Sequence, residues 1–391
     1  MLQAKTEYGN LVNLATLAKS EVIKLKAEEQ FVCPTCNEPV IVKAGSKIIP
    51  HFAHRSTLNC PSSEGGEGPY HEKGKLLLYQ WLKNQHLEVG LEVYLPEIIQ
   101  RPDLLMRIGE KTIAMEFQCA RVPLEQINSR NAGYMKLGIT PIWVIGAKRF
   151  KRLSKHSLKI DSFSLCFIHQ FSPALPLTLY YFCPETAQFS SFQHIHHINT
   201  HQTVGKLRIS PINKMSFKDI FQFHRFSSNE LYHLWKKEKR SFRLHRSNHG
   251  YGKELAWNQW VYAKGTHKEY LPSIIHLPVA SQYVMNTPVW DWQSRLCLEL
   301  LHPLSFESSF SIKRCIQIVS NHMMNKGQFP LIKGDPNPIR EYLQLLVQLN
   351  ILEQHSNEYY SKINPIHFHK NVEESLKGDE LVLNCLMENK I

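Results

Sequence analysis

The stretch Gln100–Ala120 reads QRPDLLMRIGEKTIAMEFQCA and carries two acidic residues in segments that both have strand character. Apolar residues follow Asp103, and a second apolar run covers Thr112–Cys119, with the turn sequence IGEK between them. This pattern predicts a β-hairpin. Because side chains alternate along a strand, Glu116 and Gln118 share one face, and larger apolar side chains occupy the other. We therefore expect the hairpin to bring Asp103 and Glu116 together.

Two carboxylates that meet across a hairpin repel one another, and an acidic side chain within an apolar strand is costly unless it is paired or binds a cation. Mg²⁺ favours one or two carboxylates together with waters and phosphate oxygens, and Mn²⁺ accepts the same ligands. A cation held by Asp103 and Glu116 can activate water for attack on a phosphodiester. Glu72, upstream, is a candidate third carboxylate. The alternative interpretation is a surface hairpin whose acidic side chains face solvent.

The segments around this hairpin predict an α/β unit. They are a helix at His71–Gln85, a strand at Leu87–Leu95, a helix at Pro123–Leu137 and a strand at Thr140–Ile145. A helix, hairpin-linked strands, a second helix and a further strand form one compact unit of about 75 residues. Before this unit, the sequence PSSEGGEGP (Pro61–Pro69) has the composition of a mobile linker.

A cluster of cysteines and histidines precedes the linker. Cys33 and Cys36 are separated by two residues, a spacing that lets both thiolates bind one tetrahedral ion, and His51, His54 and Cys60 follow within the same 28-residue stretch. Three cysteines and one histidine make a structural zinc site, because no position is left open for water. We favour His54 over His51 as the fourth ligand because of its spacing to Cys60. The alternatives are unrelated cysteines and histidines, or a redox role for the Cys-x-x-Cys pair.

The composition is that of a folded protein, and we expect it to be cytoplasmic. Its 391 residues suggest two or three domains, and a hydrophobic share of 43% is enough to build cores. The longest uncharged run, Ser162–Pro184, contains Pro173 and Pro176 in its interior, with a histidine and a glutamine, so we do not expect it to span a membrane. The first residues lack the apolar stretch of a secretory signal. Nine cysteines are few and odd in number, which fits a reducing compartment.

The net charge of +12 is concentrated in residues 151–250, which contain 15 Lys and Arg residues against 5 Asp and Glu. Such a block is typical of a surface that binds a polyanion, and it favours a nucleic acid as the partner. Its densest part, Trp235–Arg246, contains the four neighbouring cations Lys236, Lys237, Lys239 and Arg240. The alternative is an ordinary solvated helix face.

Beyond Pro288 the pattern becomes helical. Three helical stretches, at 290–301, 311–324 and 337–350, precede a candidate hairpin at 351–362. Three helices and a hairpin match a winged-helix-like module. A generic helical bundle accounts for the same pattern.

The motifs QRPD (100–103), MEFQ (115–118) and SRNAGYMKLGITPIWVIG (129–146), with HEKGK (71–75) upstream, resemble the nuclease-like domain of the CoiA family of bacterial competence proteins. The Cys-x-x-Cys pair and the sequence PHFAH are similar to the family's N-terminal zinc-finger-like region. The resemblance covers residues 1–150, and the remainder matches only by position. It implies a PD-(D/E)xK, or restriction-endonuclease-like, core.

In this resemblance Asp103 matches the aspartate of the PD motif and Glu116 the acidic residue of the (D/E)xK triplet. Glu72 matches the glutamate often found on the first helix of the fold. Gln118 stands where many of these nucleases have lysine. A glutamine can position a water but carries no charge, so this difference implies either slow turnover or DNA binding without cleavage.

Arg130 and Tyr134 lie four residues apart on the predicted second helix and therefore share a face. Arg130 is suited to clamp a phosphate, and Tyr134 to stack on a base or form a hydrogen bond. The alternative for both is ordinary packing against Glu125 or Gln126.

We therefore predict a nuclease of natural competence that uses Mg²⁺ or Mn²⁺ and acts on DNA during transformation and recombination. The predicted domains are 1–66 (zinc-finger-like), 67–150 (nuclease core), 151–250 (basic and strand-rich) and 251–391 (helical). Single-stranded DNA or recombination intermediates are the expected partners, together with recombination proteins. The alternative is a non-catalytic mediator that delivers incoming single strands to the recombinase. A third interpretation has the C-terminal helices act as a docking surface for a partner protein.

Overall fold

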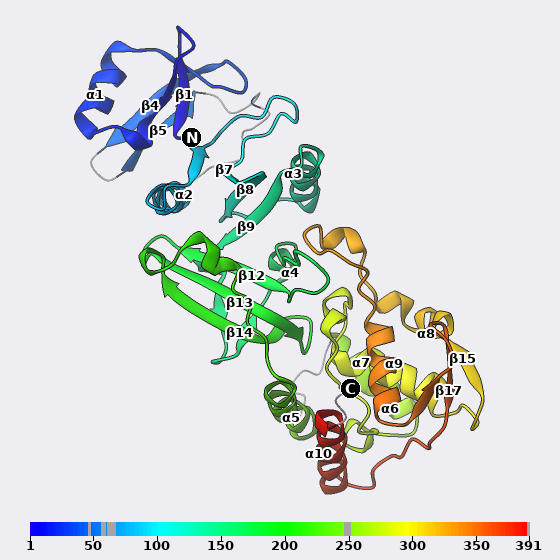
Figure 1. The fold of residues 1–391 in the computed structure, drawn as a ribbon. Coiled ribbons are helices and arrows are strands. Elements are labelled where there is room, and N and C mark those ends of the chain that lie inside the picture. Colours follow the sequence, from blue (N-terminus) through cyan, green and yellow to red (C-terminus); the bar gives the residue numbers. More distant parts are fainter. Residues whose placement is uncertain (46–47, 56–59, 61–67, 246–251, 389–391) are drawn as a thin grey trace.

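The computed structural model describes residues 1–45, 48–55, 60, 68–245 and 252–388. Within these residues the chain forms a small N-terminal sheet, a large central sheet and a mainly helical C-terminal part (Figure 1). This is the mixed α/β fold that the sequence predicts. Residues 61–67 of the predicted linker lie outside the described residues.

The N-terminal sheet is antiparallel, with the strand order β2-β1-β3-β4-β5. Its elements are β1 (Gln3–Thr6), β2 (Leu11–Asn13), α1 (Lys19–Glu28), β3 (Phe31–Val32), β4 (Pro39–Gly45) and β5 (Ile48–His54). Its core is small and centres on a few side chains such as Val22, Phe31 and Phe52. A unit with so little apolar core usually needs a metal or a neighbouring domain for stability.

The described residues of the central region form a nine-stranded sheet with the order β10-β11-β14-β13-β12-β9-β8-β7-β6. Its strands are β6 (Glu88–Leu91), β7 (Leu104–Ile108), β8 (Lys111–Gln118), β9 (Thr140–Gly146), β10 (Lys151–Arg152), β11 (Ser157–Lys159), β12 (Thr178–Cys183), β13 (Gln188–His197) and β14 (Gln202–Pro211). The predicted hairpin is β7–β8, and β9 lies parallel to β8. A parallel neighbour requires a crossover, which α3 (Leu124–Lys136) provides.

Helices cover both faces of β8, which lies between β9 and β7 in the sheet. Helix α2 (Pro69–Lys83) packs on the face that carries Met115 and Phe117, whereas α3 lies on the face of Ala114 and Glu116. This explains why the run from Ile113 to Phe117 is buried throughout. The sequence predicted the alternation of the two faces, and the structure shows that both are enclosed.

The large sheet does not end at residue 150, where we placed the boundary between the nuclease core and a separate strand-rich segment. Strand β12 pairs in parallel with β9, and β13, β14, β11 and β10 extend the same sheet. Helix α4 (Ser162–Leu165) lies in the connection between β11 and β12. Without β12, β9 would leave an open edge of apolar residues, which native sheets avoid. The two predicted segments therefore share one sheet.

Gly74 allows α2 to lie directly against β8. A Cβ atom at this position would lie only 2.0 Å from Cε1 of Phe117. The absence of a side chain therefore sets the distance between the helix and the strand. The neighbours of Gly74 on α2 are the polar residues of the candidate site described below.

We expect Gly74→Ala to lower the free energy of unfolding by about 1–2 kcal/mol, because overpacking costs more than the roughly 1 kcal/mol that alanine gains over glycine in a helix. Denaturant titration of the purified protein measures this change. Lys73→Ala, at an exposed position of the same helix turn, is the matched control and should leave stability unchanged or slightly higher. A stabilised Gly74→Ala variant would show that the ring of Phe117 moves aside freely.

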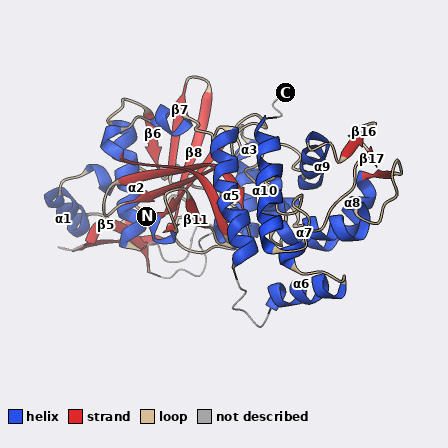
Figure 2. Cartoon of the chain, turned by 90° about the horizontal axis from the view of Figure 1, so that it is seen from below, coloured by secondary structure: helices blue, strands red, loops and turns tan. Residues whose placement is uncertain are grey.

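Two helices of the C-terminal part lie side by side although they are far apart in sequence. They are α5 (Ser228–Leu244) and α10 (Val372–Glu388) (Figures 1 and 2). Asp379 of α10 forms buried ion pairs with Lys239 and Arg243 of α5. The two helices are therefore joined by charge as well as by apolar contact.

Between these helices, the chain forms a small module in the winged-helix-like order. After α6 (Gly252–Ala263) come α7 (Val289–Leu296), β15 (Ser309–Ser311), α8 (Ile312–Val319), α9 (Pro338–Gln348), β16 (Leu352–Gln354) and β17 (Tyr359–Lys362). Strand β15 joins the predicted hairpin, which gives the order β15-β17-β16. Residues 289–362 contain seven Lys and Arg residues and seven Asp and Glu, so this module has no excess positive charge.

Among the described helices, none has the length and apolar character needed to cross a membrane.

Candidate functional site

Helix α2 directs three polar side chains toward the start of strand β7. His71, Glu72 and Lys75 lie at helical spacings of three and four residues and share one face. Glu72 is buried and Lys75 is fully buried, while the ring of His71 stacks on that of Phe117. The N-terminal half of α2 therefore directs an imidazole, an ammonium group and a carboxylate toward the interior.

Asp103 lies directly before β7, opposite Glu116. The register pairs Leu104 with Met115, so the next position along the hairpin brings Asp103 to Glu116. Oδ2 of Asp103 accepts a hydrogen bond of 2.8 Å from the backbone N–H of Phe117 and lies 3.3 Å from Nε2 of His71. The hairpin thus brings together the two carboxylates that the sequence singled out.

Glu116 is 3% exposed and is held by α3. Nη2 of Arg130 lies 2.5 Å from its Oε1, and the hydroxyl of Tyr134 donates a hydrogen bond to the same oxygen. Arg130 also donates to the backbone carbonyl of Arg101 over 3.1 Å. Both helix residues, for which we had predicted contacts with DNA or with Glu125 and Gln126, are therefore directed toward this carboxylate.

Burial, followed by the negative charge of Asp103, raises the pKa of Glu116 well above its ordinary value. The hydrogen bond from Tyr134 and the charge of Lys75 act in the opposite direction. Ionised Glu116 is thus costly in this site, and a bound cation is the usual way in which proteins offset such a cost.

Lys75 was not among the residues that sequence reasoning selected, yet it lies at the centre of the site. Its Nζ is 2.5 Å from Oε1 of Glu92, 3.5 Å from Oε1 of Glu72 and 3.7 Å from Oδ1 of Asp103. One ammonium group therefore contacts three carboxylates that come from α2, from the end of β6 and from the start of β7.

Glu92, the second residue that sequence reasoning missed, joins the site to the N-terminal sheet. Its Oε2 accepts hydrogen bonds from the backbone N–H groups of Leu2, at 2.7 Å, and Gln3, at 3.3 Å. The backbone of Glu92 has a φ of 51°, in the left-handed region that side chains rarely adopt. Such a conformation costs on the order of 1 kcal/mol, which the contacts of Glu92 with Lys75 and the first strand offset.

The signals for these two residues were weak. Lys75 belongs to the motif HEKGK, where a lysine on an amphipathic helix is usually assigned to the solvent face. Glu92 falls in the stretch LEVGLEVYL, where alternation places it on the polar side of a strand. The spacing of Lys75 to His71 and Glu72 was the one available indication that these residues share a face.

We call Glu72, Glu92, Asp103 and Glu116 the carboxylate cluster. Three cations contact these carboxylates: Lys75, Arg130 and the amino group of Met1, which lies 3.4 Å from Glu72. When all four carboxylates are ionised, they outnumber these cations by one negative charge. Carboxylate oxygens are the ligands that hard divalent cations prefer, so the donor set fits Mg²⁺ or Mn²⁺.

Gln118 lies at the end of β8 and is partly exposed. Its Nε2 donates a hydrogen bond of 2.8 Å to the carbonyl oxygen of Ala120. The side chain is therefore on the Glu116 face of the strand, as predicted, and it brings no charge to the carboxylate cluster.

The N-terminal sheet carries a second candidate metal centre. The sulfur atoms of Cys33, Cys36 and Cys60 and a ring nitrogen of His54 all lie within 4.8 Å of one another. Sγ of Cys36 is 3.3 Å from Nε2 of His54, and burial raises the pKa of this thiol to about 12. His51 instead directs Nδ1 to the carbonyl oxygen of Ile49, at 2.9 Å. The cluster can bind a metal such as zinc, and of the two histidines it contains His54.

We expect His54→Ala to reduce bound zinc from one ion per chain to well below half, and to lower the melting temperature by at least about 5 °C, because structural zinc supplies folding free energy. Metal analysis of the purified protein and thermal unfolding measure the two effects. His51→Ala is the matched control and should retain the metal. Loss of zinc from the His51 variant rather than the His54 variant would reverse the assignment.

The basic run of α5 is divided between two faces. Lys237 and Arg240 are exposed, and Lys236 forms an ion pair with Glu380. Lys239 is buried: its Nζ lies 3.2 Å from Asp379 and donates to two backbone carbonyl oxygens at 2.7 Å. The structure thus differs from our expectation for Lys239, because its amine joins α5 to α10 and is withdrawn from solvent.

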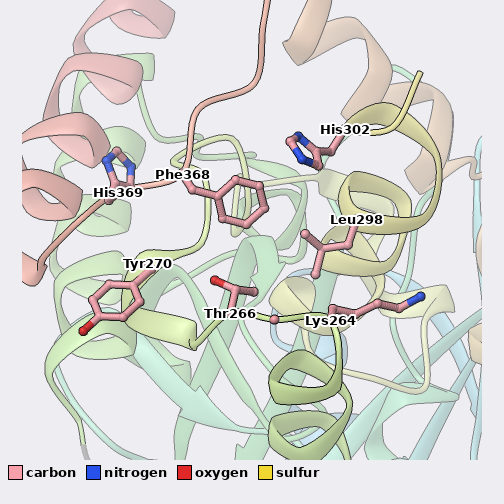
Figure 3. Close-up of a pocket in the computed structure, with 8 residues that line it drawn as sticks. Lys264, Thr266, Tyr270, Leu298, His302, Phe368 and His369 are labelled. Carbon is pink, nitrogen blue, oxygen red and sulfur yellow. The ribbon is translucent and has the colours of Figure 1, made fainter. Parts of the chain in front are cut away.

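Two cavities lie in the C-terminal half of the chain. One, of about 650 Å³, is bordered by Phe242, Trp257 and Trp290. The other, of about 410 Å³, has Tyr270 and Phe368 among its lining side chains (Figure 3). The linings of both lack members of the carboxylate cluster, so neither cavity belongs to that site.

The fold and the carboxylate cluster define a multi-domain protein built around a nuclease-like α/β core. Family models of competence protein CoiA match the chain in order: the N-terminal domain at residues 14–63, the nuclease-like domain at 67–225 and the C-terminal domain at 231–376. The chain belongs to the competence protein CoiA family, as the resemblance implied. The nuclease-like match extends to residue 225 and so includes the strands that continue the sheet beyond residue 150.

The chain is also similar to a curated relative, the competence protein CoiA of Bacillus subtilis (strain 168). The two are 28% identical over 373 residues, which cover 93% of this chain and 97% of the relative. No solved structure gives a significant match.

Proposed function

We propose that this protein is a deoxyribonuclease that requires Mg²⁺ or Mn²⁺ and processes DNA during natural transformation. Membership of the competence protein CoiA family supports a role in competence. The observation that carries the proposed activity is the convergence of Asp103 and Glu116 in a buried site where carboxylates outnumber the cations that contact them. Such a site favours a divalent cation, and a phosphodiester is the substrate class that this chemistry serves.

In the proposed mechanism Asp103 and Glu116 hold the cation and Glu72 supports them. When bound, the cation supplies an activated water and stabilises negative charge on the phosphate. His71 and the backbone N–H of Phe117 fix the orientation of Asp103. Arg130 and Tyr134 fix Glu116, so their proposed role is to position a ligand. Gln118, on the same face of β8, positions water.

The proposed substrate is single-stranded DNA or a recombination intermediate, which we expect to follow exposed cations of the basic block. Lys237 and Arg240 on α5 are exposed, and so are the cations of the β10–β11 edge, such as Lys151 and Lys159. The neutral winged-helix-like module suits contact with a recombination protein better than contact with phosphates, because it has no charge excess. We propose a cytoplasmic location, where incoming strands are recombined and where cysteines stay reduced.

We expect Asp103→Asn to lower the rate of DNA cleavage with Mn²⁺ by on the order of 100-fold or more, while DNA affinity stays within a few-fold, because the substitution removes a metal ligand but no phosphate contact. Cleavage of labelled single-stranded, duplex and branched DNA measures the rate, and fluorescence anisotropy measures the affinity. Asp335→Asn, at an exposed residue far along the chain, is the matched control. An Asp103 variant that cleaves at the wild-type rate would remove this residue from the metal site.

The second candidate function is a non-catalytic mediator that delivers single strands to the recombinase. Gln118 favours it, because the position that carries a lysine in many related nucleases is uncharged here. If the wild-type protein binds each DNA with Mg²⁺ or Mn²⁺ present and leaves all of them intact, the mediator function replaces the nuclease.

We expect replacement of Lys237 and Arg240 by Gln to reduce the slope of log affinity against log salt by about 2, since each phosphate contact contributes about one unit. Anisotropy titrations at several salt concentrations measure the slope. Lys313→Gln with Arg314→Gln, on α8 of the neutral module, is the control and should leave the slope unchanged. Equal slopes for wild type and the α5 variant would assign these two cations to ordinary solvated surface.

A further inference from the structure

We propose that Lys75 supplies, from helix α2, the positive charge that Gln118 cannot supply from strand β8. The inference rests on the proposed nuclease function and deepens it. It makes Lys75 a positioning residue of the carboxylate cluster. The (D/E)xK triplet of this chain has Gln118 in place of lysine, and we assign the role of that lysine to Lys75 on α2.

The contacts of Lys75 carry the argument. Its Nζ lies within 3.7 Å of carboxylate oxygens of Glu72, Glu92 and Asp103, and the side chain is fully buried. A lysine buried in this way requires close negative charges, because the ammonium form is otherwise too costly away from water. Three ionised carboxylates carry more negative charge than one ammonium can neutralise. Lys75 therefore holds Glu72, Glu92 and Asp103 together and still leaves them with a net negative charge.

The position of Lys75 is suited to replace a strand lysine. Asp103, which Lys75 contacts through Oδ1, lies opposite Glu116 across the β7–β8 hairpin. The other oxygen of Asp103 is fixed by His71 and by the backbone N–H of Phe117. Lys75 therefore approaches the metal-binding carboxylates from the helix side, while Gln118 occupies the strand side and turns its amide to Ala120.

Gly74, next to Lys75, makes this approach feasible. The helix backbone lies so close to Phe117 that a Cβ atom at Gly74 would be 2.0 Å from the ring. With a larger residue there, α2 would stand further from β8, and Nζ of Lys75 would lose its reach to Asp103. Close packing of the helix and the buried lysine are thus two parts of one arrangement.

Two effects on the chemistry follow. Lys75 holds the carboxylates in place for the cation, and its charge offsets the negative charge that grows on the phosphate as the bond to the leaving oxygen breaks. The same charge repels a divalent cation in the resting site. Removal of the charge should therefore slow cleavage and tighten metal binding, a combination that simple loss of structure does not produce.

The test is Lys75→Met in the full-length chain, measured by cleavage kinetics and by titration with Mn²⁺ alone. We expect kcat on single-stranded DNA to fall by about 100-fold and the Mn²⁺ dissociation constant to decrease several-fold. Lys73→Met, two residues away on the exposed side of the helix, is the matched control and should keep the wild-type values. If Lys75→Met does not fold, Lys75→Gln with Glu92→Gln removes one charge of each sign and takes its place, with the same kcat expectation.

Rescue from the strand separates a charge role from a structural one. Gln118→Lys in the Lys75→Met background restores a charge on the other side of the carboxylates, so we expect kcat to recover by at least about 10-fold over the single variant. A folded double variant that is no faster than Lys75→Met overturns the inference. A folded Lys75→Met variant with the wild-type kcat also overturns the inference.

The outcomes also separate this inference from the proposed function. A wild-type protein that binds DNA without cutting it overturns the nuclease proposal, and the Mn²⁺ titration then decides the role of Lys75 alone. Tighter Mn²⁺ binding by Lys75→Met would support the placement of its charge at the metal site. Unchanged or weaker binding by the folded variant would overturn that placement.

Discussion

The ion pairs of one buried lysine hold the central part of this molecule together. Lys75 contacts Glu72, Glu92 and Asp103, which come from three different elements, and the cost of burying these charges is offset only while all of them stay in place. The position of α2 on the sheet, the start of β7 and the end of β6 are therefore coupled. Removal of the lysine charge leaves buried carboxylates without this partner, and uncompensated buried charge is strongly destabilising.

The same interaction couples the domains. Glu92 binds Lys75 with one oxygen and the backbone of the first strand with the other, so the N-terminal sheet is attached to the carboxylate cluster itself. At the other end of the chain, Asp379 holds Lys239 and Arg243 in a second buried set of ion pairs between α5 and α10. The cations of α5 are thus divided: Lys239 and Arg243 join elements inside the molecule, whereas Lys237 and Arg240 are exposed.

The carboxylate cluster accounts for both functions considered for this family member. Its negative excess and its convergent geometry suit a divalent cation and hydrolysis of a phosphodiester. The uncharged Gln118 beside the cluster would suit a protein that has kept the fold for binding alone. The proposed role of Lys75 reconciles these observations, because the electrostatic requirement of phosphodiester hydrolysis concerns where a charge lies and not which element carries it.

The sequence alone determined the hairpin, its flanking helices and β9 within a few residues, because alternation, turn residues and proline positions are local properties. It also determined that Asp103 lies opposite Glu116 and that Cys33 and Cys36 lie close together, since a short loop or a two-residue spacing limits the geometry. Only the tertiary structure decided that Lys75 and Glu92 belong to the site, that Arg130 and Tyr134 face Glu116, that Lys239 is internal and that the sheet continues past residue 150. These outcomes depend on contacts between residues distant in sequence, where a polar side chain on a helix or strand has the same local pattern whether it meets water or a buried partner of opposite charge.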